Sequence, residues 1–87
     1  MGLTITEIRD RTLRARHLMQ RSRQQGFAVG AFNIDNQETL IAVARAAQKL
    51  SSPVLVEVSH GEVEAMGLEN IRDMVDNYRD EYGIEIY

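Results

Sequence analysis

The sequence contains no cysteine and only two histidines, His17 and His60. The absence of cysteine excludes a disulfide framework, a thiolate nucleophile and every zinc site built on thiolates. Two histidines are too few for a histidine-rich metal site, so we expect no metal ligands within this segment. Long apolar runs are also missing. The longest, Phe27–Phe32, falls far short of the roughly 20 residues that a membrane helix needs.

The beginning of the chain shows no apolar signal-peptide core, so we expect a cytoplasmic location and no membrane partner. Eighty-seven residues allow one domain at most. An apolar fraction of 44% with 26% charged residues is ordinary for a globular chain and argues against overall disorder. We therefore treat residues 1–87 as a single segment.

Charge is unevenly distributed along the chain. Residues 1–26 contain six arginines against two acidic residues, whereas residues 27–87 are strongly acidic, and the net charge is −3. A basic arm on an acidic body has two interpretations, a nucleic-acid adaptor or a solvated helix face. No aromatic residues alternate with the arginines and no nucleic-acid motif frames them, so we expect no nucleic-acid partner. We assign no role to the arginines or to His17.

Residues 4–25 have the spacing of an amphipathic helix, with Thr4 or Thr6 as its N-cap and Gly26 just after its last turn. Its predicted buried stripe comprises Ile5, Ile8, Thr12, Ala15 and Met19, widened by Leu18. The nearly continuous apolar run Phe27–Ile34 then predicts a strand buried on both faces, as in a parallel sheet.

Asp35 and Glu38 have capping-box spacing and predict the start of the next helix. The buried face of this helix would comprise Leu40, Val43, Ala44, Ala47 and Leu50. The segment 51–53, with its proline, ends the helix, and Val54–Val58 predicts a second strand.

Ser59 and Glu62 again have capping-box spacing, which predicts another helical stretch that Gly67 interrupts. A stripe of Leu68, Ile71, Val75, Tyr78 and Tyr82 marks its second piece. Residues 84–87 resemble the start of a third strand. The pattern therefore predicts an α/β chain, an N-terminal helix followed by βαβαβ with parallel strands and right-handed crossovers.

Three polar residues lie where such a fold places its binding groups, at the carboxyl ends of the strands. Asn33 ends the first strand, Ser59 follows the second, and Glu57 shares a strand face with Ser59. Each also has a structural interpretation: Asn33 as turn chemistry, Ser59 as an N-cap, and Glu57 as the exposed face of an edge strand. His60, next to a glycine at a helix start, could help to hold a phosphate or simply be exposed.

The block Phe27-Ala-Val-Gly-Ala-Phe-Asn-Ile34, followed by Ser-Pro53-Val-Leu-Val and then Val-Ser59-x-Gly61, resembles the N-terminus of class II ketose-bisphosphate aldolases. This family includes the zinc-dependent fructose- and tagatose-1,6-bisphosphate aldolases. The resemblance covers essentially the whole chain. It implies a TIM (β/α)8 barrel of about 250 residues, of which this chain would be the first part: the N-terminal helix in 1–26, and the first βα units with the start of a third strand in 27–87.

The resemblance further implies reversible aldol cleavage of a ketose 1,6-bisphosphate to dihydroxyacetone phosphate and glyceraldehyde 3-phosphate, a lyase step of glycolysis and carbohydrate metabolism. The family's zinc ligands and its catalytic acid/base lie after the third strand, so the resemblance places neither in this segment. It implies that the chain alone is inactive and binds no zinc. It also implies a sugar phosphate as substrate and a homo-oligomer at full length.

Carried over by position, Ser59 matches the family serine that contacts phosphorylated substrate, and Asn33 matches the asparagine at the active-site edge of strand one. Glu57 stands where many relatives carry a polar residue that points into the barrel. His60 falls at a variable position and receives no role. The alternative is a non-enzymatic βαβαβ module, flavodoxin-like in outline. Such a module would bind a phosphate or a partner through the Asn33/Ser59 edge.

Overall fold

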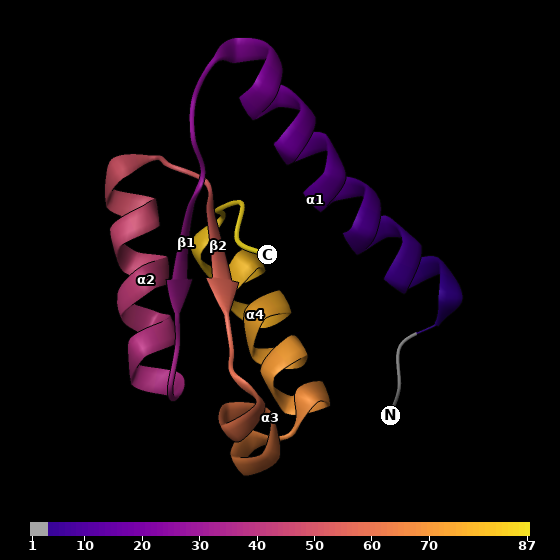
Figure 1. Ribbon diagram of the computed structural model, residues 1–87, viewed down its shortest axis with the longest axis vertical. Helices are drawn as coiled ribbons and strands as arrows, with labels where there is room; N and C mark the ends of the chain where they lie inside the picture. The colour runs from indigo at the N-terminus through magenta and orange to yellow at the C-terminus, as the bar shows by residue number, and fades with distance from the viewer. Residues whose placement is uncertain (1–3) are drawn as a thin grey trace.

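A computed structural model describes residues 4–87 of the chain (Figure 1). In this range the elements follow in the order α1 (Ile5–Gln25), β1 (Gly30–Asn33), α2 (Gln37–Leu50), β2 (Val54–Glu57), α3 (His60–Met66) and α4 (Leu68–Tyr82). The predicted alternation of helices and strands is confirmed, and so is the break at Gly67 between two helical pieces. The chain is therefore a mixed α/β structure.

The sheet places β2 in its centre. On one side β1 pairs with β2 in parallel along the whole length of both strands. On the other side the backbone N–H groups of Val54 and Val56 donate to the carbonyls of Glu85 and Tyr87, at 2.9 and 2.8 Å. A parallel bridge joins Val54 to Ile86, so residues 84–87 do begin a third parallel alignment. The order across the sheet thus follows the order along the chain.

Helices α2 and α4 pack against each other and against the same face of the sheet. The buried cluster between them comprises Ile34, Leu40, Ala44, Ala47, Val54, Ile71, Val75 and Ile86. Val56 and Val58 pack against this cluster, so the side chains that alternate with Glu57 face the core. The opposite face is open at Ala31, Asn33 and Glu57, which are exposed.

The prediction of a first strand buried on both faces is wrong. Only Gly30–Asn33 form the strand, and all four residues are exposed. Nothing in the described part of the chain pairs with the outer edge of β1, and Phe32 remains 49% exposed beside an apolar hollow between β1 and α2. The Phe32 ring lies over Gly30, where a Cβ atom would come within 2.7 Å of it, so a larger residue at position 30 would displace this ring.

Helix α1 begins and ends as predicted. Thr4 and Glu7 form a capping box, and Gly26 takes the left-handed conformation that stops the helix. Its predicted apolar stripe is confirmed at Leu18, which is fully buried, but is wrong at Ile5 and Met19, which are 70% and 42% exposed. The buried residues are Leu18 and Ser22, one turn apart. This helix therefore contacts the rest of the chain through a narrow, partly polar strip.

The N-cap of helix α2 lies one residue later than predicted. Asn36, not Asp35, is the N-cap, and its side-chain oxygen accepts from the Thr39 N–H at 2.9 Å. The Thr39 hydroxyl in turn accepts from the Asn36 N–H, so Thr39 replaces Glu38 in the capping box. The buried face is confirmed at Leu40, Ala44 and Ala47.

The outermost members of the two predicted helix faces are not buried. Leu50 at the end of α2 is 73% exposed and Leu68 at the start of α4 is 63% exposed. Both lie in the end turn of a helix, beyond the reach of the facing helix. The buried face of α4 instead gains a charged residue, Arg79, which the apolar pattern did not indicate.

Candidate functional site

The carboxyl ends of β1 and β2 bring the predicted site residues to one edge of the sheet. Asn33 and Glu57 are direct register partners, and the Ile34 N–H donates to the Glu57 carbonyl at 2.9 Å. Ser59 lies two residues after the end of β2 and directly precedes α3, which lies where the strand arrows point in Figure 1. The structure thus places these three residues at one end of the two strands, and their role as a site stays a prediction.

Asn33 is held by two carboxylates. Its side-chain amide nitrogen donates to Oδ1 of Asp35 and to Oε1 of Glu62, each at 2.9 Å. The amide group is thus anchored to its own loop and to the first turn of α3. Sequence reasoning missed both partners: Glu62 was singled out only for its capping-box spacing, and no local signal links it to a residue 29 positions earlier.

Ser59 is the N-cap of α3. Its backbone is extended, and its hydroxyl oxygen accepts from the Glu62 N–H at 3.5 Å, which is long for a hydrogen bond. The side chain is exposed, and within residues 4–87 its hydroxyl donates to no acceptor. The N-cap interpretation is therefore confirmed, but the weak contact leaves the hydroxyl able to serve a bound molecule as well.

Glu57 and His60 differ in their relation to this edge. Glu57 is exposed on the open face of the central strand, so the edge-strand interpretation is wrong, because residues 84–87 pair on the far side of β2. His60 lies one turn from Glu64, with 2.9 Å between Nε2 and Oε1, and its side chain is 87% exposed. His60 thus belongs to the outer surface of α3.

The hydrogen bond from Asn33 lowers the pKa of Glu62 below its ordinary value; desolvation opposes this shift, and backbone hydrogen bonds at Ser59 and Glu62 add to it. The ionised form of Glu62 is therefore the one that the fold favours. Two carboxylates, those of Asp35 and Glu62, thus hold the Asn33 amide, and Glu57, the register partner of Asn33, is exposed on the neighbouring strand.

We expect replacement of Asn33 by alanine to raise the pKa of Glu62 toward its ordinary value of about 4.3. The pKa of Glu62 is lower in the folded chain than in the unfolded chain. Its contribution to stability is therefore fully present above the unfolded-state pKa, and it is lost as the pH falls through the folded-state pKa. The measurement is an NMR titration of the Glu62 carboxyl carbon in both proteins. Asn77→Ala, on exposed α4 surface, is the matched control. An identical midpoint in Asn33→Ala would disprove the contact.

The described residues do not supply a metal site. No three histidine, aspartate or glutamate side chains within residues 4–87 are grouped so that they could hold a metal ion. The carboxylates near Asn33 are engaged with its amide or exposed on separate elements, and His60 faces away with Glu64. In the same range no helix is both long and apolar enough to cross a membrane.

Comparisons with known proteins point to one family. A sequence model of class-II fructose-bisphosphate aldolase matches residues 13–87. The fructose-bisphosphate aldolase of Streptococcus pneumoniae (strain ATCC BAA-334 / TIGR4) is 36% identical over 73 residues, which is 83% of this chain and 25% of that protein. The fructose-bisphosphate aldolase of Streptococcus pyogenes serotype M1 is 34% identical over the same coverage.

A relative that is named for a different aldolase activity matches as well. The sulfofructosephosphate aldolase of Alkalicoccus urumqiensis is 30% identical over 61 residues, or 70% of this chain and 21% of that protein. The chain therefore spans between a fifth and a quarter of the length of these curated relatives.

Proposed function

Because the chain belongs to the class-II fructose-bisphosphate aldolase family, we propose that it forms part of an enzyme that reversibly cleaves a ketose 1,6-bisphosphate. The products would be dihydroxyacetone phosphate and glyceraldehyde 3-phosphate. The observation that carries this proposal is the family match, which includes both strands and the whole edge around Asn33 and Ser59. The names of the streptococcal relatives support the same reaction.

We propose further that residues 1–87 are the first part of a (β/α)8 barrel, with α1 as the extra N-terminal helix. The sheet order supports this: residues 84–87 pair with β2, whereas in a flavodoxin-like sheet the third strand pairs with the first. The position of α2 and α4 on one face also supports it, since doubly wound sheets carry helices on both faces. The same two observations disfavour the standalone flavodoxin-like module.

In this enzyme Asn33 and Ser59 would hold the substrate. The Ser59 hydroxyl can donate to a phosphate or hydroxyl oxygen, and the Asn33 amide can do so once it leaves Glu62 or Asp35. Glu57, exposed beside Asn33, would face the same cavity. The carboxylates at this edge repel a dianion, so we assign the Asn33 contact to a hydroxyl or carbonyl oxygen of the sugar.

Zinc would polarise the carbonyl of the substrate in an enzyme of this family. The described residues do not fit the role of its ligands, because they offer no group of three donors. The role of this segment in the reaction is therefore to bind and orient the sugar phosphate. We place the assembled enzyme, as a homo-oligomer, in the carbohydrate metabolism of the cytoplasm.

The test is a chimera with the Streptococcus pneumoniae fructose-bisphosphate aldolase, whose matching quarter is replaced by residues 1–87. We expect the zinc-loaded chimera to cleave fructose 1,6-bisphosphate at a measurable rate in an assay coupled to triose phosphate formation. The 87-residue chain alone should show no cleavage and should retain no stoichiometric zinc after dialysis, because a catalytic zinc takes about three protein ligands.

The control is a chimera whose grafted segment carries Asn33→Ala and Ser59→Ala together, which should fold and lose most of the activity. A folded, zinc-loaded chimera without activity would contradict the proposed function. Cleavage by the 87-residue chain alone would contradict the restriction of this segment to substrate binding.

A further inference from the structure

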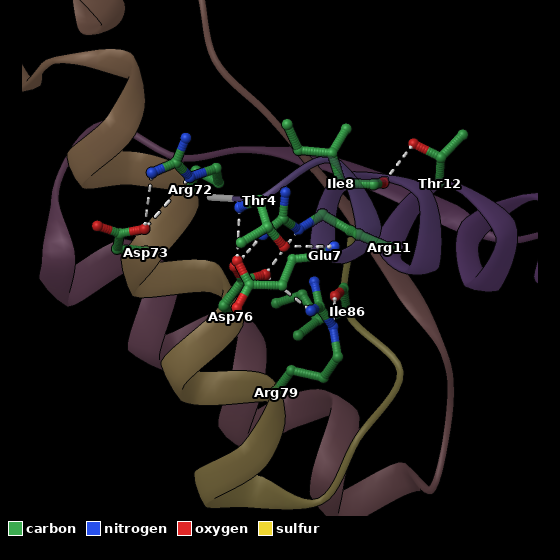
Figure 2. A network of polar contacts seen from close by, with 10 residues as sticks. All are labelled: Thr4, Glu7, Ile8, Arg11, Thr12, Arg72, Asp73, Asp76, Arg79 and Ile86. Carbon is green, nitrogen blue, oxygen red and sulfur yellow. Dashed lines mark hydrogen bonds and ion pairs between the residues drawn. The ribbon is translucent and has the colours of Figure 1, made fainter. Parts of the chain in front are cut away.

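A buried arginine ties α4 to the beginning of the third strand. Arg79 is only 6% exposed, and its Nε donates to the backbone carbonyl of Ile86 at 2.7 Å. Its Nη1 donates to Asp76 at 2.8 Å, one turn earlier on the same helix (Figure 2). A guanidinium is always charged, so its burial is tolerated only with such partners. One side chain therefore fixes two elements to each other.

The remaining nitrogen of Arg79, Nη2, is buried and has no hydrogen-bond acceptor within residues 4–87. The ring of Tyr87 lies over the guanidinium, 4.5 Å from its central carbon to the ring centroid. This cation–π contact partly compensates the missing hydrogen bond. Both Ile86 and Tyr87, the residues that align with β2, are thus held by Arg79.

Helix α1 also contacts Asp76, the carboxylate that accepts from Arg79. Arg11 makes a two-pronged contact with Asp76, with 2.9 Å from Nε to Oδ1 and a second bond from Nη2, as Figure 2 shows. Burial opposes ionisation of Asp76, but the hydrogen bonds from Arg11 and Arg79 outweigh it and lower the pKa of Asp76. Arg21 pairs with Glu85.

We propose that Arg79 is a positioning residue that sets the register of residues 84–87 beside β2, and that α1 steadies it through Arg11 and Asp76. The arginines of α1 that face the body thereby gain a role within the chain, which replaces the nucleic-acid interpretation for them. This role is independent of aldolase chemistry, so an inactive chimera would leave it standing.

The burial of Ile86 shows why the register of residues 84–87 beside β2 matters. Ile86 is fully buried in the core, whereas its neighbours are not. A slip of one residue would turn Ile86 to the opposite face, because side chains alternate along a strand. It would also take the Ile86 carbonyl away from Arg79. The hydrogen bond and the burial of Ile86 therefore select the same alignment.

The experiment is residue-resolved amide hydrogen exchange of the 87-residue chain and its Arg79→Met variant. The Val56 N–H, which donates to Tyr87, reports on the third strand, and the Ile34 N–H, which donates to Glu57, reports on the β1–β2 pair. We expect exchange at Val56 to rise by on the order of 10- to 150-fold, the factor for a lost hydrogen bond to a charged group, beyond any rise at Ile34.

Arg72→Met is the matched control, since Arg72 lies on the same helix and, among residues 4–87, pairs with its neighbour Asp73 alone. Arg79→Lys keeps the charge and the stem, and serves if the methionine variant does not fold. Its single ammonium cannot reproduce the forked contact, so it should show the same selective loss at Val56. An equal rise at Val56 and Ile34, or no rise at Val56, would overturn the proposal.

Discussion

Replacing Leu40 by alanine should destabilise the chain by about 2–5 kcal/mol, the cost of deleting a buried leucine side chain and leaving a cavity. Leu40 is fully buried in the cluster between α2, α4 and the sheet. A domain of this size has a total stability of only about 4–13 kcal/mol, so a large part of it depends on this one side chain. Denaturant unfolding followed by circular dichroism measures the change.

Leu50 offers a control of the same residue type on the same helix. Because it is 73% exposed, Leu50→Ala should change the free energy of unfolding by no more than about 0.5 kcal/mol. Equal losses in the two variants would mean that the buried cluster does not hold the fold together. A loss confined to Leu40→Ala would establish α2 as a packed layer of this segment.

In the aldolase chimera, Ser59→Ala should lower kcat/KM by on the order of 10- to 150-fold. The reason is the loss of a hydrogen bond to a charged substrate, which contributes roughly 1.5–3 kcal/mol, with each 1.36 kcal/mol worth a factor of ten. The structure leaves the hydroxyl weakly engaged, since its contact with the Glu62 N–H is 3.5 Å long. Steady-state kinetics with fructose 1,6-bisphosphate would give this ratio.

A pure N-cap role gives a different result for the same variant. It predicts a loss of about 1 kcal/mol in stability with unchanged kcat/KM. Ser52→Ala is the control, because Ser52 is exposed in the turn before β2 and its hydroxyl donates to the Pro53 carbonyl, at 3.4 Å, as its single hydrogen bond in the part of the chain that the structure describes. A lowered melting temperature with unaltered kinetics would show that Ser59 is a cap and nothing more.

The sequence predicted most accurately the helix caps and helix ends that depend on residues close together in the chain. Thr4, one of the two predicted caps of α1, Gly26 and Ser59 each act through residues at most a few positions away, and each lies where expected. The error at Asn36 was a shift by one residue between two polar side chains that both can cap a helix. Such choices depend on backbone geometry that spacing alone does not determine.

The larger failures depend on contacts between distant parts of the chain. The apolar run that contains Phe32 predicts burial on both faces, but that burial needs further neighbouring elements, and the described residues place none at the outer edge of β1. The burial of Arg79 could not be foreseen, because it depends on the Ile86 carbonyl, which lies beyond the helix, and on Asp76, which Arg11 of α1 also contacts. Likewise the pairing of Asn33 with Glu62 exists only once β1 and α3 meet.

The strand order described above has a consequence for how the chain emerges from the ribosome. Each strand joins the edge formed by its predecessor, so pairing can keep pace with synthesis at about 5–20 residues per second. Within residues 4–87 this order leaves the outer edge of β1 unpaired, and in the proposed barrel it would stay unpaired until the last strand closes on it. We therefore expect chaperones that recognise nascent chains to bind at β1 and its exposed Phe32, the earliest part of the sheet to form and the longest to remain uncovered.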